Sequence, residues 1–433
     1  MASIDLEKMM RIKTLLRTSS ALPAFPLGVG LVILYYTSDT SRLIAFFPIP
    51  YAPLLVERPL EPMYAVTYAL VSAAAAWQGA RLKESGVWDA PPYRRTWQII
   101  ASALAPIVGL GWLMFIVPVG MAFIQSPTLP TLVALPPLLL GMALAVAHAL
   151  IGFTIGQRVR PLIAVPVLVS VVFVIVSFSQ SVEPLYLSHM MGNYAGMLGF
   201  GETATLASIA ANFLPTAGLG LAVALMWLNA RVVFKVGLAC VVVAASVFTS
   251  YSIAKDWKAF PSVNVATEKV CRGSEPRVCM PEQISGDIGA VRAEMKKTYA
   301  MLETYGIIEH PPATVNDQLM YGRFTQRPTE STRYLPLAVA HRDRHLVADV
   351  VEDSVRFPCD IPTAGAERTV SFWLSLKLGG NPEYAKVAEQ DPYYTREQHE
   401  KIMKEVHRVS ALPAGKQKTW YRTTTKKACE GRP

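Results

Sequence analysis

Long apolar runs in the first 253 residues constrain this chain more than any other feature of its sequence. A helix that crosses the hydrocarbon core of a bilayer needs about 20 predominantly apolar residues. Seven segments come close to that length or exceed it, and the second is the weakest because it is short and alanine-rich. The predicted spans are Ser20–Thr37, Pro62–Gln78, Trp97–Gln125, Pro130–Ile155, Leu162–Gln180, Ser208–Leu228 and Val233–Tyr251.

Charged residues are distributed unevenly along the 433 residues. The chain is 52% hydrophobic and only 17% charged, against about 25% charged in average soluble domains. Residues 1–253 hold 14 Lys or Arg and 9 Asp or Glu, whereas the remainder holds 27 and 23. That remainder of about 180 residues is long enough to bury a core of its own. We therefore predict an amphipathic N-terminus over residues 1–19, a transmembrane domain over 20–253 and a globular domain over 254–433.

The loops between the predicted spans carry an asymmetric positive charge, which predicts the orientation of the chain. Cytoplasmic loops of membrane proteins are enriched in Lys and Arg. Twelve basic residues precede the first span or lie in alternate loops, and the opposite loops hold only Arg42 and Arg58. The twelve are Lys8, Arg11, Lys13, Arg17, Arg81, Lys83, Arg94, Arg95, Arg158, Arg160, Arg231 and Lys235. The pattern predicts a plasma-membrane protein with an inside N-terminus and an extracytoplasmic C-terminal domain.

The expected fold class is accordingly an all-α polytopic membrane protein followed by a mostly α-helical outer domain. In the outer domain, Ile288, Val291, Met295, Tyr299 and Leu302 recur at helical spacing. The net charge of +9 does not indicate nucleic acid, because five of those charges belong to the membrane part, where basic loops orient helices.

Four of the five cysteines fall in the predicted outer domain. Cys271 and Cys279 are eight positions apart, which suits neither the two-to-four-residue spacing of zinc ligands nor the C-x-x-C of a redox pair. An oxidising compartment permits disulfides, so we predict a local clip between Cys271 and Cys279. Of the three pairings that four cysteines allow, we favour the one that also joins Cys359 to Cys429. Cys240 stands alone in the seventh span.

The predicted spans hold almost no ionisable groups, and His148 in the fourth span is the exception. One interpretation places it on a pore or substrate, and the more ordinary one gives it a hydrogen bond to Ser or Thr of a neighbouring helix. Gly152 and Gly156 follow at the small-xxx-small spacing that permits close helix packing. The apolar, proline-rich loop SRLIAFFPIPYAPLLVERP is not expected to be part of a regular spanning helix.

The longest predicted cytosolic connection runs from Arg81 to Thr96. It combines Trp88 with the Arg94–Arg95 pair, residue types that dominate interface hot spots. The loop suits docking of a cytosolic partner, and it suits equally an interfacial anchor with the indole at the headgroups and the guanidinium groups on phosphates. The residues alone favour neither interpretation.

Several short motifs are similar to those of one group of membrane proteins. The inner-loop sequence WDAPPYRR, AHALIGF in the fourth span, EPLYLSH after the fifth and VCRGSEPRVCMPE in the outer domain resemble actinobacterial ABC-2-type permease-like proteins. The resemblance implies a multi-pass subunit that works with a separate ATPase. Such permeases generally have six spans and a cytosolic C-terminus, and the present chain departs from both features.

Motifs for independent catalysis are not found. HRDRH, His341–His345, lacks the Glu of H-E-x-x-H, and His399–Glu400 is followed by Met403 where the second His is required. There is no G-x-x-x-x-G-K-[ST] loop and no G-x-S-x-G elbow. We expect no enzyme activity, cofactor or metal, with the lipid bilayer and a cytosolic ATPase as partners.

Two functional hypotheses follow, and a membrane-anchored hydrolase ranks below both. The first is a permease-like subunit of an ABC-type export or immunity system. The second is a non-transporting receptor or envelope-assembly protein, whose outer domain binds an extracellular ligand or protein.

Overall fold

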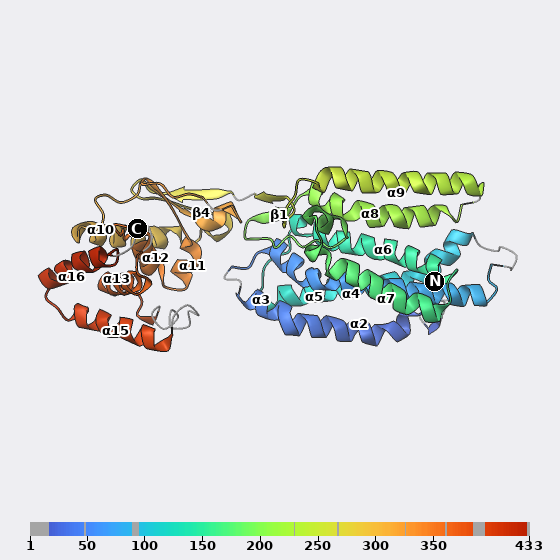
Figure 1. Ribbon diagram of the computed structural model, residues 1–433, viewed down its shortest axis with the longest axis horizontal. Coiled ribbons are helices and arrows are strands. Elements are labelled where there is room, and N and C mark those ends of the chain that lie inside the picture. Colours follow the sequence, from blue (N-terminus) through green and yellow to red (C-terminus); the bar gives the residue numbers. More distant parts are fainter. Residues whose placement is uncertain are drawn as a thin grey trace, which may run out of the picture. The chain divides into compact units, whose positions relative to one another are not determined.

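The computed structural model describes residues 17–46, 49–88, 95–228, 230–265, 268–324, 326–359, 362–383 and 395–430. Contacts divide the chain between Asn264 and Val265 into an N-terminal unit and a C-terminal unit, whereas the sequence prediction placed this boundary after residue 253. Both units are mainly helical (Figure 1).

The N-terminal unit is a bundle of long helices. Its helices are α2 (Ala21–Tyr35), continued by the π-helical η1 (Tyr36–Thr40) and α3 (Ser41–Phe46), then α4 (Ala52–Glu84), α5 (Thr96–Gln125), α6 (Pro136–Gly156), α7 (Pro161–Ser177), α8 (Leu206–Leu225) and α9 (Val232–Ala254). Short 3₁₀ segments η2 (Leu132–Ala134), η3 (Ser179–Ser181) and η4 (Leu185–Met190) lie in its connections. Strands β1 (Glu202–Ala204) and β2 (Val263–Val265) form a two-stranded sheet.

Five stretches of the described residues are long and apolar enough to cross a membrane. They are Ala21–Ile44 and the helices α5, α6, α8 and α9. Helix α7 is apolar but has only 17 residues. Helix α4 has 33 residues but a much lower mean hydropathy than its neighbours, so it is not among the five. The prediction of helices long and apolar enough to span a membrane is therefore confirmed for these stretches.

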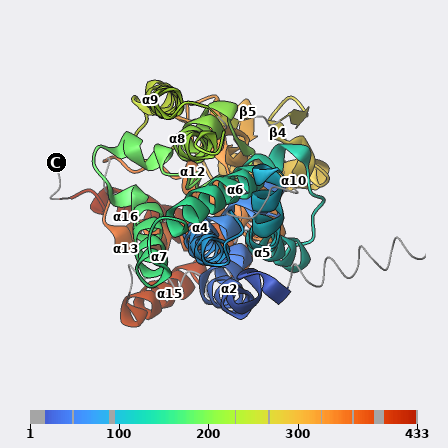
Figure 2. The same ribbon diagram turned by 90° about the vertical axis from the view of Figure 1, so that its right-hand side faces the viewer.

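Helix α4 occupies the centre of the bundle, in contact with α2, α5, α6 and α7 (Figure 2). It begins at Ala52, ten residues before the predicted span, with Pro59 and Pro62 inside it. Both ends of the proline-rich loop are therefore helical, since α3 covers its start and α4 its second half. Pro53 lies in the first turn of α4, where a missing N–H interrupts no intrahelical hydrogen bond. Pro59 and Pro62 lie deeper in the helix, where neighbouring helices can satisfy the groups that they free.

The α4 extension also brings charge into the bundle, at residues 57–61 that precede the predicted second span. Glu57 is completely buried and its Oε1 accepts the N–H of Met197 at 2.9 Å. Arg58 lies between two carboxylates, 3.8 Å from Glu57 and 3.7 Å from Glu61. These groups were missed because the sequence assigned them to a loop.

Glycines allow α4 and α6 to cross closely. A Cβ atom at Gly152 would overlap the carbonyl oxygen of Ser72, and one at Gly156 would overlap that of Ala76. The reverse holds at Gly79 of α4, where a Cβ atom would overlap the carbonyl oxygen of Phe153. The close packing expected from the spacing of Gly152 and Gly156 is confirmed.

The C-terminal unit contains a four-stranded sheet in the order β3-β4-β5-β6, with helices packed around it. The strands are β3 (Lys269–Arg272), β4 (Arg277–Pro281), β5 (Thr314–Asp317) and β6 (Thr332–Leu335). Strands β3 and β4 are antiparallel, whereas β4, β5 and β6 are parallel. The helices are α10 (Ile288–Thr304), α11 (Leu337–Arg342), α12 (Leu346–Ser354), α13 (Ala364–Lys377), α15 (Arg396–Ser410) and α16 (Ala414–Lys427), with 3₁₀ turns η5 (Glu282–Ile284) and η6 (Gln318–Tyr321).

The sheet was not predicted from the sequence, which indicated a mostly α-helical domain. The five apolar residues predicted for one face of α10 are all buried. Both disulfides form with the predicted pairing. Cys271 and Cys279 face each other across the β3–β4 hairpin with Cα atoms 4.1 Å apart, and Cys359 joins Cys429 across 70 residues.

Candidate functional site

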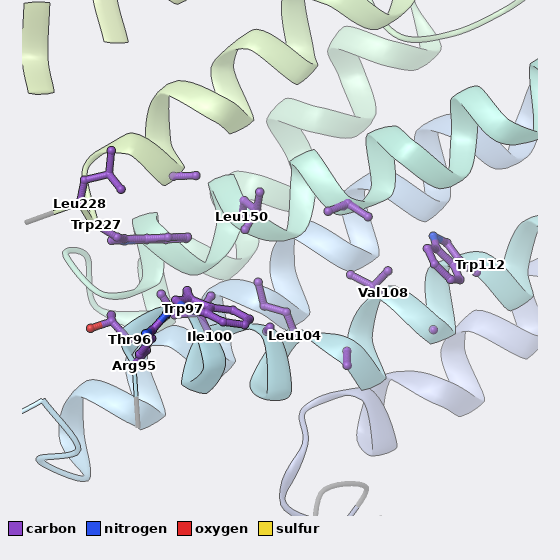
Figure 3. Close-up of a pocket in the computed structure, with 15 residues that line it drawn as sticks. Arg95, Thr96, Trp97, Ile100, Leu104, Val108, Trp112, Leu150, Trp227 and Leu228 are labelled. Atoms are coloured by element: carbon purple, nitrogen blue, oxygen red, sulfur yellow. The ribbon is translucent and has the colours of Figure 1, made fainter. Parts of the chain in front are cut away.

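A groove of about 900 Å³ lies on the side of the N-terminal unit, between α5, α6 and the end of α8. We call it the lateral groove. Figure 3 shows Trp97 and Trp227 near one end of it and Trp112 toward the other. The exposed fractions of Trp97 and Trp112 are 59% and 38%, so the groove opens outward from the bundle instead of into its core.

The hollow exists because one face of α5 carries small side chains. Ala101, Ala105 and Gly109 recur every four residues and all line the groove. Residues four apart lie above one another on a helix, so these three form a continuous shallow strip. A Cβ atom at Gly109 would meet no atom within 4 Å, which shows that the space beside it is open.

The aromatic residues at the two ends are held by contacts to the bundle. The indole N–H of Trp112 donates to the carbonyl oxygen of Met142 on α6 at 2.9 Å. The Trp227 ring packs edge-on against Phe153, with ring centroids 6.1 Å apart. Its Nε1 is buried and has no hydrogen-bond partner in the described part of the chain, so the groove contains an unused donor.

Arg95 lies at the Trp97 end of the groove. Its side chain is exposed, and its backbone N–H donates a hydrogen bond to Gln98 Oε1 at 3.2 Å, which fixes the start of α5. No carboxylate of the described residues lies within ion-pair distance of it. The groove therefore combines an apolar trough with a cation at one end, the arrangement that suits a molecule with a long apolar part and an anionic group.

Of the three predicted coupling-loop residues, the structure describes Trp88 and Arg95. Trp88 is half-buried and packs against the hydrophobic core of the bundle, with its indole nitrogen buried. Arg95 belongs to the lateral groove, and Arg94 falls outside the described residues. Because Trp88 is directed into the bundle, its contacts are those of an anchor for the loop. A role of the loop in coupling to a partner stays a prediction.

His148 makes the helix-to-helix hydrogen bond that was the more ordinary of its two interpretations. Its Nδ1 lies 3.2 Å from Ser72 Oγ, and its ring stacks on Tyr68 at 4.5 Å between centroids. Both partners are on α4, so the contact reinforces the α4–α6 crossing beside Gly152. It lies away from the residues that line the lateral groove.

The two histidines of HRDRH have separate partners. His341 Nδ1 lies 3.1 Å from Glu294 on α10, whereas His345 Nδ1 lies 3.2 Å from Asp349 on α12. The hydrogen bond from Asp349 raises the pKa of His345. No group of three or more potential metal ligands occurs among the residues that the structure describes.

The sequence analysis missed the lateral groove. A signal was present, since Ala101, Ala105 and Gly109 share one face of a helix that has Trp97 and Trp112 near the ends of that face. It identifies a groove only when the helices that form the other wall are known, and Leu150 and Trp227 come from distant parts of the chain. Comparison of the chain with protein-family models, curated proteins and solved structures found no match.

Proposed function

We propose that this protein is a permease-like membrane subunit that handles an anionic amphiphile through its lateral groove. The observation that carries the proposal is the apolar, outward-facing trough on α5 that ends at Arg95. The resemblance to ABC-2-type permease-like proteins supports the same role. A separate ATPase would supply the energy, since the sequence has no nucleotide-binding motif of its own.

Seven helices would cross the membrane in this proposal, with the N-terminus inside and the C-terminal unit outside. The short α6–α7 and α8–α9 connections favour antiparallel neighbours, so alternate connections fall at the same end of the bundle. That end carries most of the basic residues, including Arg95, and basic residues favour the cytoplasmic side. The disulfides of the C-terminal unit support an oxidising, outer location for it.

In this proposal α4 can span the membrane despite its low mean hydropathy. The residues of α4 that would otherwise meet lipid contact other helices instead, and 25 of its 33 residues are buried. These residues therefore need not be apolar, because they do not contact lipid. The short helix α7 can span with local thinning or with snorkelling of the adjacent Arg160.

The groove suits lateral exchange between the protein and the inner leaflet. A hydrocarbon chain would lie along Ala101, Ala105 and Gly109, where its methylenes contact apolar side chains as favourably as they contact lipid. The head group would meet Arg95, and the Trp227 indole N–H would donate to an ester or phosphate oxygen. These contacts distinguish an anionic amphiphile from a neutral hydrocarbon.

Filling the groove tests this proposal. Gly109→Leu places a side chain in open space, so it should block the trough without disturbing the backbone. Gly120→Leu is the matched control, because Gly120 is on the same helix, has equally open surroundings and does not line the groove. Native mass spectrometry of the purified protein should show retained anionic lipid falling about tenfold in the first variant and unchanged in the second.

Energy coupling is tested separately. Protein purified from native membranes should bring an ATPase with it, identified by mass spectrometry, and Arg94→Ala should reduce that yield while Gly120→Leu should not. If lipid retention responds to Gly109→Leu but no ATPase is recovered, the groove binds lipid and the transport role fails. Equal lipid retention in both glycine variants would contradict lipid binding in the lateral groove.

The alternative, a receptor or envelope-assembly protein, is favoured by one specific feature of the C-terminal unit. That unit contains a polar cavity with a buried tyrosine hydroxyl, which the lateral groove does not explain. A ligand for this cavity would give the outer unit a role of its own.

A further inference from the structure

A cavity of about 550 Å³ opens in the C-terminal unit. The end of α10, the connection over residues 307–313, β6 and the end of α12 form its walls. Its volume falls within the range of ordinary small-molecule sites. It is built entirely from described residues, and it is separate from the lateral groove.

Tyr299 supplies an unused hydrogen-bond donor in this cavity. Its side chain is 2% exposed, and its hydroxyl has no hydrogen-bond partner in the part of the chain that the structure describes. Burial and the nearby Asp353 carboxylate raise the pKa of Tyr299, against the opposing effect of Arg333 and Arg356. The hydroxyl therefore keeps its proton at neutral pH and can donate it to an acceptor. Buried hydroxyls without a partner are uncommon in native proteins.

Two arginines line the same cavity. Arg333 lies on β6 and contacts Asp353 through Nε at 3.4 Å, its only ion pair among the described residues. Arg356 uses Nη1 to donate to the backbone carbonyl oxygens of Asp353 and Val355 at the end of α12. Among the described residues, the remaining terminal nitrogens of both guanidinium groups have no further hydrogen bond or ion pair, so they can bind another acceptor. Guanidinium groups bind carboxylates with two parallel hydrogen bonds.

Part of the cavity lining is apolar. Ile307, Ile308, Pro311 and Pro312 lie on the connection that follows α10 and line the cavity. Exposed carboxylates of Glu309 and Glu330 lie at its edge, where they would repel a ligand that is only anionic. A ligand with a carboxylate, an apolar side chain and a nearby ammonium or amide group would complement all three regions.

We propose that this cavity binds the carboxylate of a free amino acid or of a peptide C-terminus whose last side chain is apolar. Tyr299 donates one hydrogen bond to the carboxylate, and Arg333 and Arg356 supply the positive charge. The apolar side chain packs against Ile307, Ile308 and the two prolines. Capture of a terminal carboxylate by converging donors is a recurrent mode of peptide recognition. The site does not depend on the proposed transport role.

Calorimetry on the full chain in detergent tests the site with three probes: alanyl-leucine, its C-terminal amide, and free leucine. We expect alanyl-leucine or leucine to bind with a millimolar or lower Kd, and the amide to bind at least about tenfold more weakly. Stronger binding of leucine than of alanyl-leucine would identify a free amino acid as the ligand type. Preference for the dipeptide would identify a peptide C-terminus.

Three variants test which residues contact the ligand. Tyr299→Phe removes only the unpartnered hydroxyl, so the unliganded protein should melt at the same temperature or higher while the affinity falls about tenfold. Arg356→Gln should weaken binding by a similar factor. Arg342→Gln is the control, because Arg342 is exposed and pairs with Asp343 at 2.8 Å outside this cavity. The proposal is overturned if neither acid binds, if acid and amide bind equally, or if Tyr299→Phe binds like the wild type.

Discussion

Helices α4 and α10 both contribute to the hydrophobic core of their own unit, but different kinds of residue are buried in the two. In α10 the apolar residues face the core and the charged residues face water, so its buried side could be identified from periodicity. In α4 the buried residues include Glu57 and Ser72, each completely enclosed. Helix α9, by contrast, is more apolar than α4, yet none of its most apolar window is buried within the protein.

The difference shows that the relation between the hydropathy of a helix and its burial depends on the solvent around the unit. In water, apolar area is driven inward, so burial follows polarity. In a membrane the lipid is as apolar as the protein core, and helices associate through close packing and hydrogen bonds. The most apolar helices can therefore be those most exposed to lipid, and a central helix is free to carry polar groups that neighbours satisfy.

The strongest test of this difference is Gly152→Leu in α6. Overpacking costs about 1–3 kcal/mol in a typical core, and we expect more here because the new side chain meets the backbone of α4, which cannot rotate away. The matched variant Gly237→Leu places the same side chain on α9 with no atom within 4 Å. Size-exclusion chromatography and melting in detergent should show loss of folded protein only for Gly152→Leu. Similar behaviour of the two variants would contradict an α4-centred bundle.

The disulfides should matter only to the C-terminal unit. Replacing Cys359 and Cys429 by Ala opens a loop of 70 residues, and chain entropy predicts a loss of about 4 kcal/mol. The Cys271–Cys279 loop has a separation of eight, so its removal should cost less, about 2.5 kcal/mol. Hydrogen exchange measured by mass spectrometry should rise in peptides of 265–433 and stay unchanged in α4. Increased exchange throughout both units would show that the two cores are not independent.

A pH-dependent effect concerns a buried carboxylate in the C-terminal unit, Asp317. Asp317 accepts the N–H groups of Leu319 and Ala338, both favouring its charged form, but burial dominates and raises its pKa from 3.8 to about 6. The folded state then binds more protons than the unfolded state between about pH 4 and pH 6. The free energy of unfolding of this unit should therefore fall across that window by up to about 3 kcal/mol, and level off above it.

Asp317→Asn should remove that dependence, because the amide does not titrate. The measurement is the difference between wild-type and variant unfolding free energies from pH 4 to pH 7, monitored on C-terminal peptides. Asp343 provides a control of opposite sign, since the hydrogen bond from exposed Arg342 lowers its pKa. A difference that rises with pH would show that the two backbone hydrogen bonds outweigh burial at Asp317.

Much of the architecture followed from sequence patterns that act locally. Runs such as Val233–Tyr251 predicted helices to within a few residues, and the spacing of Gly152 and Gly156 predicted a close crossing. The cysteine pairing followed from spacing and compartment. The mixed sheet could not be predicted in this way. Strands β4, β5 and β6 are short, parallel and joined by long connections, and a segment of four or five residues does not indicate which strand it pairs with.

The sequence by itself therefore determined where helices lie and which stretches suit a membrane, since both depend on the polarity of residues close in sequence. It also determined where disulfides form, since that depends on cysteine spacing and on the compartment. Only the tertiary structure decided that α4 is enclosed, because its neighbours α2, α5, α6 and α7 must be placed before its polar residues have partners. The same holds for the lateral groove and for the cavity at Tyr299. A hollow is defined by walls from separate elements, and no single segment contains both sides of it.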